Sequence, residues 1–575
     1  MATVASTAPV ERRRFGFDVS RPVLAAFAVI LFALIAMPLS WLIYYAFTTK
    51  AGAFTLDNFH RLVSDAAYID PLLTTFALAT LSAIICCVVA APMGWLVART
   101  DMPLRRTVRL LVTASFVTPP FLGAIAWELL AAPNSGLLNQ LYRELTGAPQ
   151  GAHLMNIYSF SGLVFVISCY TFPYVFVLVA NALDRTPGDL EDASAILGGK
   201  TWDTARRITI PLALPAVLAG ALVAFLQAMT LFGSPAILAM PAGFHTMTTK
   251  IWSLFQFPPQ PELAAAASLP LLLLTIILLR AEHMVLGRRG YSVVGAKNSE
   301  PRIVLLGVWR WVMLGLAMFV LMFPVFLPYF ALLNASFSRV ASHLVWFNNF
   351  TLQNVHFVFY ELSATQLALR NTFILGVLAA TAGTVLAMVI AYVYVRQAVK
   401  GYRVLGFLAT APVAIPGIVL GVGLFFTYTR PPFVLYGTLW ILLIAFVTLN
   451  MPAAYQQLQS AFKAVHPELE DASRILGASR LRALWQITAP LLRTSVIATW
   501  CFIFVGVIRE LSAAVMLFTS ETKVLSVLIY DLNESGDLAA IAVLGLLMLI
   551  LTFGIVALAN TLKFGGARRL SAIPS

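Results

Sequence analysis

Two short acidic segments of nearly identical sequence are the most distinctive chemical feature of the chain. Residues 190–198 read LEDASAILG and residues 469–477 read LEDASRILG, so eight of nine positions are identical. The second and third residues of each segment are carboxylates, which favour the N-terminus of a helix, and the last is a glycine, which permits a sharp change of direction. The pattern predicts two copies of a helix followed by a turn. We expect each copy to contact a partner.

Each segment continues into a second short helix. Residues 191–211 read EDASAILGGKTWDTARRITIP, and residues 470–490 read EDASRILGASRLRALWQITAP. The basic, amphipathic stretch after each glycine ends at Pro211 or Pro490, and proline suits the first turn of the next helix. We refer to residues 191–211 as the first elbow and to residues 470–490 as the second elbow. Two equivalent elbows predict two equivalent partners.

Outside the elbows, groups that could catalyse a reaction or hold a metal are scarce. The seven histidines are scattered, and the four cysteines lie in apolar runs without a CxxC pair. We therefore predict no catalytic residue and no metal site. Gly199-Lys200-Thr201 resembles the end of a phosphate-binding loop, but Ser194 stands where that loop requires a glycine. We expect no cofactor on this chain.

The composition is that of a membrane protein. Of 575 residues, 60% are hydrophobic and 11% are charged, whereas a soluble domain carries roughly 25% charged residues. The net charge of +13 comes from short Lys and Arg clusters between apolar runs, a pattern typical of topology signals and not of a nucleic-acid-binding domain. Twelve runs are long enough to span a bilayer as helices: residues 22–47, 71–98, 109–131, 157–182, 208–233, 263–280, 303–333, 369–395, 404–428, 435–458, 489–518 and 538–562.

The distribution of positive charge predicts the orientation. An even number of spans puts both ends of the chain on one side. Loops and tails on that side hold 28 Lys and Arg, and the opposite loops hold 8. Cytoplasmic loops are enriched in these residues, so we expect both termini in the cytoplasm. The first run follows Arg12, Arg13 and Arg14 and is too long for the core of a cleaved signal peptide, which indicates a retained first span.

A few polar residues lie inside the apolar runs. Ionisable groups are costly in lipid and are therefore candidates for a transport pathway. They are Glu128, Arg509 and Glu510, with Gln227 as a neutral candidate. Arg509 and Glu510 are adjacent and point about 100° apart on a helix, so we expect no simple facing pair. The alternatives are bracing between helices, a place in an external vestibule and, for Gln227, interhelical hydrogen bonding.

The two halves of the chain repeat each other. The elbows are related by an offset of 279 residues. Upstream, at an offset near 297, Thr55-Leu56-Asp57-Asn58 resembles Thr351-Leu352-Gln353-Asn354, Thr75-Phe76 resembles Thr372-Phe373, and Pro119 resembles Pro416. A longer external loop near residues 132–156 accounts for the difference, and an insertion there costs little. Six spans per half predict parallel repeats with a pathway at their interface.

The predicted organisation follows from this repeat. It consists of a cytoplasmic tail (1–21), a first repeat (22–281, core about 70–281), a cytoplasmic linker (282–302), a second repeat (303–562, core about 367–560) and a second cytoplasmic tail (563–575).

The elbows resemble the EAA loop of ATP-binding-cassette importer permeases, whose pattern is E-A-A-x3-G-x9-I-x-L-P. The pattern here is D-A-S-x3-G-x9-I-x2-P, with Ile210 and Ala489 in place of the leucine. The positions that carry the resemblance are Asp192, Ala193, Ser194, Gly198, Ile208 and Pro211, and Asp471, Ala472, Ser473, Gly477, Ile487 and Pro490. Glu191 and Glu470 precede the position of the family's glutamate, so the sequence leaves open which acidic neighbour makes the contact.

The resemblance covers nearly the whole chain and implies an all-α membrane protein made of two fused type I importer permease domains (MetI-like fold). It implies that the elbows are coupling helices, each seated in a cleft of a separate ATPase subunit that binds Mg-ATP. Two ATPase copies, a periplasmic substrate-binding protein and a bacterial inner membrane are expected. Segments 232–252 and 509–518 resemble the ferric-iron branch, whose relatives carry 2-aminoethylphosphonate, thiamine or polyamines.

Two functions of other classes are alternatives to the importer-permease interpretation. A secondary transporter driven by an ion gradient would also have repeats, with ionisable residues near the bilayer centre. The chain has few such residues, and twin elbows would have no purpose there. A membrane-embedded enzyme is unsupported, because the sequence shows no histidine cluster, paired carboxylates or nucleophile motif.

Overall fold

The structure is a computed structural model that describes residues 20–149, 151–186, 188–287, 302–342, 349–398, 400–478 and 480–570. The described chain is almost entirely helical, with isolated β-bridges and no strand. Of the predicted tails and linker, residues 1–19, 288–301 and 571–575 lie outside the described residues.

The elements follow the order of the repeat. Those of the first half are α1 (Ser20–Leu31), η1 (Phe32–Ala36), α2 (Met37–Ala46), α3 (Asp57–Ser64), α4 (Ala66–Arg99), α5 (Arg105–Val117), α6 (Pro120–Ala131), α7 (Leu137–Thr146), α8 (Phe160–Asp184), α9 (Asp189–Ile196), α10 (Thr201–Thr204), η2 (Ala205–Thr209), α11 (Ile210–Thr230), α12 (Gly233–Leu238), α13 (Met247–Ser253) and α14 (Pro261–Gly287). Those of the second half are α15 (Trp309–Leu321), η3 (Met322–Phe326), α16 (Leu327–Phe337), α17 (Gln353–His356), η4 (Phe357–Glu361), α18 (Ser363–Val395), α19 (Tyr402–Thr410), η5 (Ala411–Ala414), α20 (Gly417–Tyr428), α21 (Leu439–Ala464), α22 (Glu468–Ile475), α23 (Arg480–Ala483), η6 (Leu484–Thr488), α24 (Ala489–Arg509), α25 (Ala514–Leu517), α26 (Leu525–Ser535) and α27 (Leu538–Leu570).

Two of the twelve predicted spans are broken helices. In the described chain, ten helices are long and apolar enough to cross a membrane, and two further spans are bent pairs. α5 and α6 meet at 97°, and α19–η5 and α20 meet at 112°. Thr118 and Ile415 have extended backbones at the two breaks, because each lies just before Pro119 or Pro416 and a residue before proline avoids the helical conformation. The predicted runs 109–131 and 404–428 are therefore not straight helices.

Four π-helical turns end just before a proline. η1, η2, η3 and η6 each end two residues before Pro38, Pro211, Pro328 or Pro490. Proline removes a backbone donor, and its ring crowds the carbonyl of the preceding turn. A turn widened by one residue is one way to relieve this conflict inside a continuous helix.

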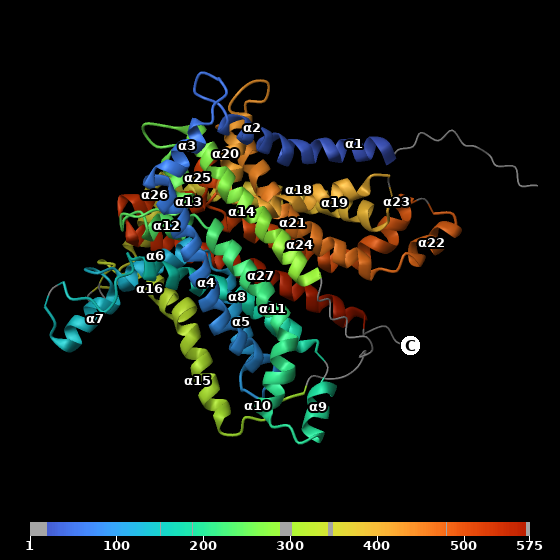
Figure 1. The fold of residues 1–575 in the computed structure, drawn as a ribbon, viewed down its shortest axis with the longest axis horizontal. Helices are drawn as coiled ribbons and strands as arrows, with labels where there is room; N and C mark the ends of the chain where they lie inside the picture. The colour runs from blue at the N-terminus through green and yellow to red at the C-terminus, as the bar shows by residue number, and fades with distance from the viewer. Residues whose placement is uncertain are drawn as a thin grey trace, which may run out of the picture.

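The first span of each half packs against the other half. α1 and α2 lie along α19 and α20, and α15 and α16 lie along α5 and α6 (Figure 1). Because proline cannot donate a backbone hydrogen bond, η1 and η3 each leave one carbonyl without a backbone donor. A side chain of the opposite half donates to that carbonyl. The Tyr428 hydroxyl donates to the Ala33 carbonyl at 3.0 Å, and the Trp127 indole donates to the Phe323 carbonyl at 3.2 Å. Each packed bundle thus contains α1 or α15 of the other sequence repeat, while α2 and α16 also pack against α14 and α27 of their own half.

Residues that match between the halves make equivalent hydrogen bonds. Asn58 and Asn354 each donate to backbone carbonyls at the end of the preceding span. Thr75 and Thr372 each accept the first backbone N–H of a short helix, α13 or α26, at 2.7 and 2.8 Å. These pairs confirm the internal repeat at the level of side-chain contacts.

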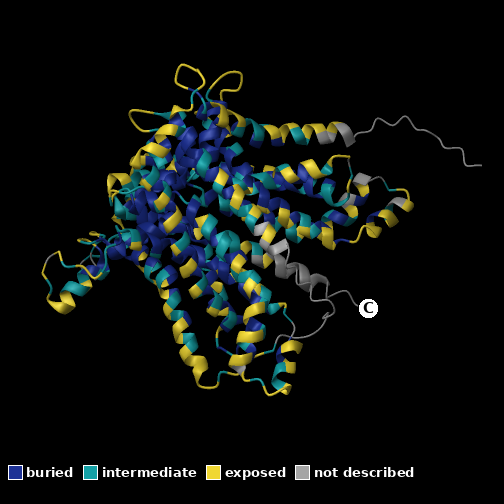
Figure 2. Cartoon of the chain, viewed as in Figure 1, coloured by how far each residue is buried: buried dark blue, intermediate teal, exposed yellow. Residues whose placement is uncertain are grey.

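The two bundles form a wedge. They converge near α12, α13, α25 and α26 and diverge toward the elbow helices α9 and α22 (Figure 1). Buried residues gather where the bundles converge, while the elbows and the loops at the opposite end are exposed (Figure 2).

The cross-half hydrogen bonds predict a measurable contribution to stability. Tyr428→Phe leaves the Ala33 carbonyl without a donor in an apolar environment, and we expect a loss of about 1 kcal/mol in the free energy of unfolding. Unfolding in mixed detergent micelles, followed by tryptophan fluorescence, measures it. Tyr436→Phe is the matched control, because Tyr436 belongs to the same half as Tyr428 and lines a cavity between the halves. Equal stability of both variants would contradict the assignment.

Candidate functional site

Both elbows consist of a helix, a glycine turn and a second helix that leads through a π turn into a span. The first elbow runs from α9 through Gly198 to α10, η2 and α11, and the second runs from α22 through Gly477 to α23, η6 and α24. The φ angle is +81° at Gly198 and +91° at Gly477, a conformation that strains any residue with a Cβ. The space around both glycines is open, so backbone conformation and not crowding requires glycine there.

The first acidic residue of the first elbow is buried at its base. The Glu191 carboxylate accepts a hydrogen bond from the Thr209 hydroxyl at 2.7 Å and lies 3.5 Å from the Arg99 guanidinium. Arg99 is 1% exposed and also donates to the Thr186 carbonyl at 2.7 Å. One carboxylate therefore connects the elbow to the end of α4 and to the start of the next span. We refer to Glu191, Arg99 and Thr209 as the first clamp.

The second elbow has the same arrangement. The Glu470 carboxylate accepts from the Thr488 hydroxyl at 2.9 Å and pairs with Arg396, which follows α18, at 2.9 Å. Arg396 also donates to the Val465 carbonyl at 3.1 Å. We refer to Glu470, Arg396 and Thr488 as the second clamp. Its members lie at the two repeat offsets, 297 residues for the arginine and 279 for the other two.

The second acidic residue of each elbow points outward. The Asp192 side chain is 61% exposed and lies 3.4 Å from Arg302, and Asp471 is also exposed. The structure thus separates the acidic neighbours that the sequence left equivalent: the glutamates lie inside the elbow and the aspartates outside it. Of the other predicted residues, Ala193, Ala472, Pro211 and Pro490 are exposed, and Ser194, Ser473, Ile208 and Ile487 are partly buried.

The outer end of each elbow is apolar. Leu197 is 87% exposed and Leu476 is 90% exposed. Ile196, Trp202 and Ile475 are exposed beside them. We refer to these five residues as the apolar tips. Contiguous exposed apolar side chains of this kind mark contact surfaces.

A cavity of about 720 Å³ lies between the two repeats. We refer to it as the central cavity. α6, α8, α11 and α14 form its walls on one side, and η5, α20, α21 and α24 form them on the other. Both helix breaks reach it, through Pro120 and Gly417. Three of the four predicted pathway residues, Gln227, Arg509 and Glu510, line it.

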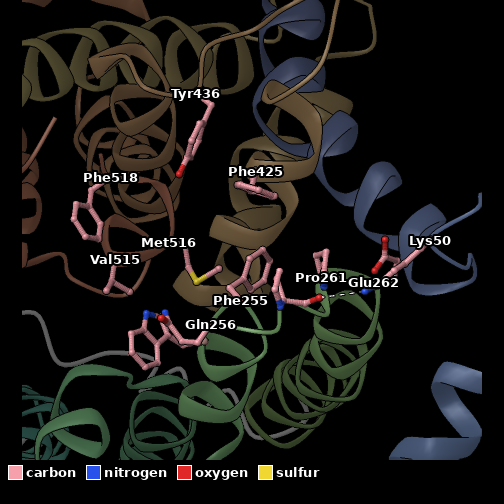
Figure 3. A pocket seen from close by; sticks show the side chains of 12 residues that line it. Lys50, Phe255, Gln256, Pro261, Glu262, Phe425, Tyr436, Val515, Met516 and Phe518 are labelled. Atoms are coloured by element: carbon pink, nitrogen blue, oxygen red, sulfur yellow. Dashed lines mark hydrogen bonds between the residues drawn. The ribbon is translucent and has the colours of Figure 1, made fainter. Parts of the chain in front are cut away.

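A second cavity of about 660 Å³ is lined by residues near α2, α20 and α25 (Figure 3), and these helices lie at the end opposite the elbows (Figure 1). Five of its twelve lining residues are aromatic, and Phe255 of the first half packs on Phe425 of the second with ring centroids 5.3 Å apart (Figure 3). Lys50 and Glu262 are also among its lining residues. We refer to it as the outer cavity.

A packed layer separates the two cavities. Ser512, just before α25, lines the central cavity, and Met516 within α25 lines the outer one. Beside α25, the rings of Phe232, Trp252 and Tyr530 form a cluster with centroid distances of 5.9, 6.0 and 6.1 Å. Because the cluster joins both halves, it holds them together at the end where they converge.

The fourth pathway candidate, Glu128, is elsewhere. Its carboxylate accepts the Tyr158 hydroxyl at 2.7 Å, and it is not among the residues that line the central cavity. This geometry fits the bracing role that the sequence left as an alternative.

Comparison with known proteins places both elbows in one family. The model of the binding-protein-dependent transport system inner membrane component matches the chain twice, at residues 90–288 and 383–563. The chain belongs to this family. Each match contains one elbow and one clamp, and every residue that lines the central cavity lies within the two matches. The exchanged first spans precede each match.

Similar proteins include two ferric transport permeases. The chain is 25% identical to the ferric transport system permease protein FbpB of Actinobacillus pleuropneumoniae over 76% of this chain and 63% of that protein. It is 26% identical to the putative ferric transport system permease protein FbpB 1 of Haemophilus influenzae over 71% of this chain and 64% of that protein. The molybdenum transport system permease protein ModB of Mycobacterium bovis is 27% identical over 41% of this chain and 87% of its own length. The chain thus matches less than two thirds of the length of the two ferric relatives.

The clamps were not predicted from the sequence. Arg99 and Arg396 counted only as positive charges at the ends of spans, and Thr209 and Thr488 had no assigned role. A signal was present, because both threonines stand two residues before the proline that ends each elbow and both arginines recur at the upstream repeat offset.

The first clamp predicts that neighbouring acids differ in importance. Glu191→Gln leaves Arg99 buried without its counter-charge, and breaking a buried pair from one side costs about 3–5 kcal/mol. We expect faster amide hydrogen exchange across α9 and η2 in that variant. Asp192→Asn is the matched control, because an exposed pair contributes at most about 1 kcal/mol. Equal exchange in the two variants would show that the clamp does not hold the elbow.

Proposed function

We propose that this chain is the transmembrane permease subunit of an ATP-driven, binding-protein-dependent importer in a bacterial inner membrane. The chain itself is not an enzyme. Two copies of a separate ATPase bind Mg-ATP and receive the two elbows, and a periplasmic binding protein delivers cargo to the opposite side. The observation that carries this proposal is the pair of equivalent elbows with exposed apolar tips, each fixed at its base by a buried clamp.

The geometry supports a mechanism of alternating access. The elbows connect through the clamps to the ends of α4 and α18 and to the starts of α11 and α24. When ATP draws the two partner subunits together, the elbows move with them and the bundles rock about the packed layer. A shift of this kind requires that ATP bind the closed partner dimer more tightly than the open one. The divergence of the bundles toward the elbows fits the inward-facing state (Figure 1).

The elbow side is assigned to the cytoplasm. The excess of Lys and Arg in loops on that side supports this orientation, and the ATPase requires it because ATP is cytoplasmic. Both termini then lie in the cytoplasm, and the outer cavity faces the periplasm.

The proposed cargo is ferric iron. Support comes from the two ferric transport permeases, which match 76% and 71% of this chain, whereas the molybdenum permease matches 41%. The same machinery serves the alternatives 2-aminoethylphosphonate, thiamine and polyamines. An ion-coupled secondary transporter is the alternative of a different class.

Purification of the tagged chain from its native membrane in mild detergent tests the proposal. We expect an ATPase subunit to accompany it at two copies per chain. If the chain emerges alone under conditions that preserve known complexes, ATP coupling is overturned, and uptake driven by an ion gradient becomes the function to measure.

The apolar tips predict where the ATPase binds. Leu197→Asp combined with Leu476→Asp places a charge in each contact. Loss of two leucines that the bound ATPase would cover weakens binding by at least about tenfold. The recovered ATPase, measured by mass spectrometry, reports the loss. Leu145→Asp is the control, because Leu145 is 77% exposed on α7, away from the elbows. Full recovery with the double variant would remove the tips from the interface.

The glycine turns predict loss of transport without loss of insertion. Gly198→Val combined with Gly477→Val forces valine into a left-handed conformation, which costs about 1–2 kcal/mol per residue and redirects each elbow. We expect uptake of radioactive iron to be abolished while the amount of protein in the membrane is unchanged. Gly52→Val is the control, since Gly52 has a φ of +82° in an open loop on the other side. Unaltered uptake by the double variant would refute the coupling role.

A further inference from the structure

The central cavity contains one pair of charged side chains, and the protein satisfies one member of the pair more fully than the other. Among its lining residues in the described chain, Arg509 and Glu510 are the charged ones. The Glu510 carboxylate accepts the backbone N–H of Ala513 at 2.9 Å. It also lies at the start of α20, 3.2 Å from where a Cβ on Gly417 would sit, so this carboxylate is used within the protein.

Arg509 has unused hydrogen-bonding capacity. Its Nε is buried without a partner, and its Nη2 lies 3.5 Å from the Thr118 carbonyl, at the limit of a hydrogen bond. The guanidinium also lies over the Phe116 ring at 5.6 Å. None of the ion pairs found in the described residues includes Arg509. The Arg509 side chain as a whole is partly exposed where it lines the cavity, and a buried donor without an acceptor, such as this Nε, is costly.

The broken helix of the first half adds a partial positive charge at the cavity, where the charges of Arg509 and Glu510 are otherwise equal and opposite. α6 begins at the cavity, and its first backbone bond runs from Gly123 to the Pro119 carbonyl. The N–H of Phe121, which lines the cavity, precedes that bond. Helix N-termini carry partial positive charge and favour anions, as do the half-helices of other transporters. At the corresponding break in the second half, Glu510 already supplies the anion.

The cavity is a poor site for a bare metal cation. Across the residues that the structure describes, no group of three or more His, Cys, Asp or Glu could hold a metal ion. Among the described residues, the cavity lining has one carboxylate and contains neither histidine nor cysteine. A trivalent cation prefers several oxygen ligands and is repelled by a guanidinium.

We propose that the central cavity takes its cargo as an oxyanion or as a complex that presents an oxyanion, and that Arg509 binds this group. Guanidinium groups match phosphate-like and carboxylate oxygens because their N–H donors form a planar fork. The inference rests on the proposed importer function and narrows its substrate class. For ferric cargo, the iron crosses with an oxyanion among its ligands and not as the bare ion.

The repeat explains why the charge is confined to one half. At the offset of 279 residues, Arg509 and Glu510 correspond to Thr230 and Leu231, and both of these also line the cavity. The helices around the cavity are related by the repeat, but the side chains that line it are not. Such a difference is expected where the lining binds an asymmetric cargo, whereas packing between the two halves does not require it.

Binding to the purified full-length chain in detergent tests the proposal. The probes are inorganic phosphate, molybdate, citrate and ferric citrate, each compared with sodium chloride at equal ionic strength, and the readout is the dissociation constant from the shift in thermal unfolding midpoint. We expect oxyanion binding by the native chain, at least about tenfold weaker binding by Arg509→Gln, and an intermediate affinity for Arg509→Lys. Arg430→Gln is the matched control, since Arg430 stacks on Tyr45 on the opposite side from the elbows.

The pattern of responses separates the sources of the oxyanion. A response to phosphate or molybdate assigns a free oxyanion, and a response confined to ferric citrate assigns an oxyanion held on iron. A native chain that responds to none of them beyond chloride, or an Arg509→Gln variant that binds like the native chain, overturns the proposal. If Arg509 only braces Thr118 and Phe116, Arg509→Gln lowers the midpoint without ligand but keeps its affinity, which also overturns it. Should Arg509→Gln fail to fold, Arg509→Lys decides, because native affinity in that variant refutes a guanidinium site.

The two proposals fail separately. Recovery of the ATPase with an Arg509→Gln chain that binds oxyanions normally removes the oxyanion site and leaves the importer intact. Oxyanion binding that depends on Arg509 in a chain that never co-purifies with an ATPase leaves the site intact and removes the importer.

Discussion

The constraint on which this structure depends is that no backbone hydrogen-bonding group can be left unsatisfied in lipid. The sequence puts prolines inside spans, and every such proline removes a donor. Where Pro38 and Pro328 follow π turns, a hydroxyl or an indole of the other half donates a hydrogen bond to the carbonyl that lacks a backbone donor. Where Pro119 and Pro416 stand, the helix breaks, and both breaks adjoin the central cavity. Prolines therefore determine both how the halves are joined and where polar backbone lies within the membrane.

The clamps apply the same constraint to charged groups, which are buried only together with their partners. Each takes a carboxylate from an elbow, an arginine from the end of one span and a threonine from the start of another, and encloses all three. The desolvation of such a pair is repaid only while its geometry is kept. An elbow held in this way moves together with the spans at its base, which is the mechanical property that coupling to a partner demands. The same burial leaves Asp192 and Asp471, with the apolar tips, as the face available for contact.

Symmetry and asymmetry have separate places in the molecule. The π turns, the helix breaks, the clamps and the glycine turns occur twice, because both halves need the same backbone solutions and meet equivalent partners. The lining of the central cavity differs between the halves, and in the part of the chain that the structure describes its charged residues belong to the second half. Side chains that support the fold thus recur at matching positions in both halves, whereas side chains that line the central cavity differ between the halves.

The sequence by itself determined the features that depend on local pattern: the spans, from runs of apolar residues; the repeat, from nearly identical segments; and the elbows, from capped helices around Gly198 and Gly477. Only the tertiary structure decided which acidic neighbour is buried, because Glu191 meets an arginine 92 residues away and no local period encodes that distance. It also decided that the first spans exchange between halves, and that Gln227, Arg509 and Glu510 share a cavity that Glu128 does not reach. Hydropathy records whether a residue prefers lipid, but the partner that satisfies a buried polar group is set by how distant segments pack.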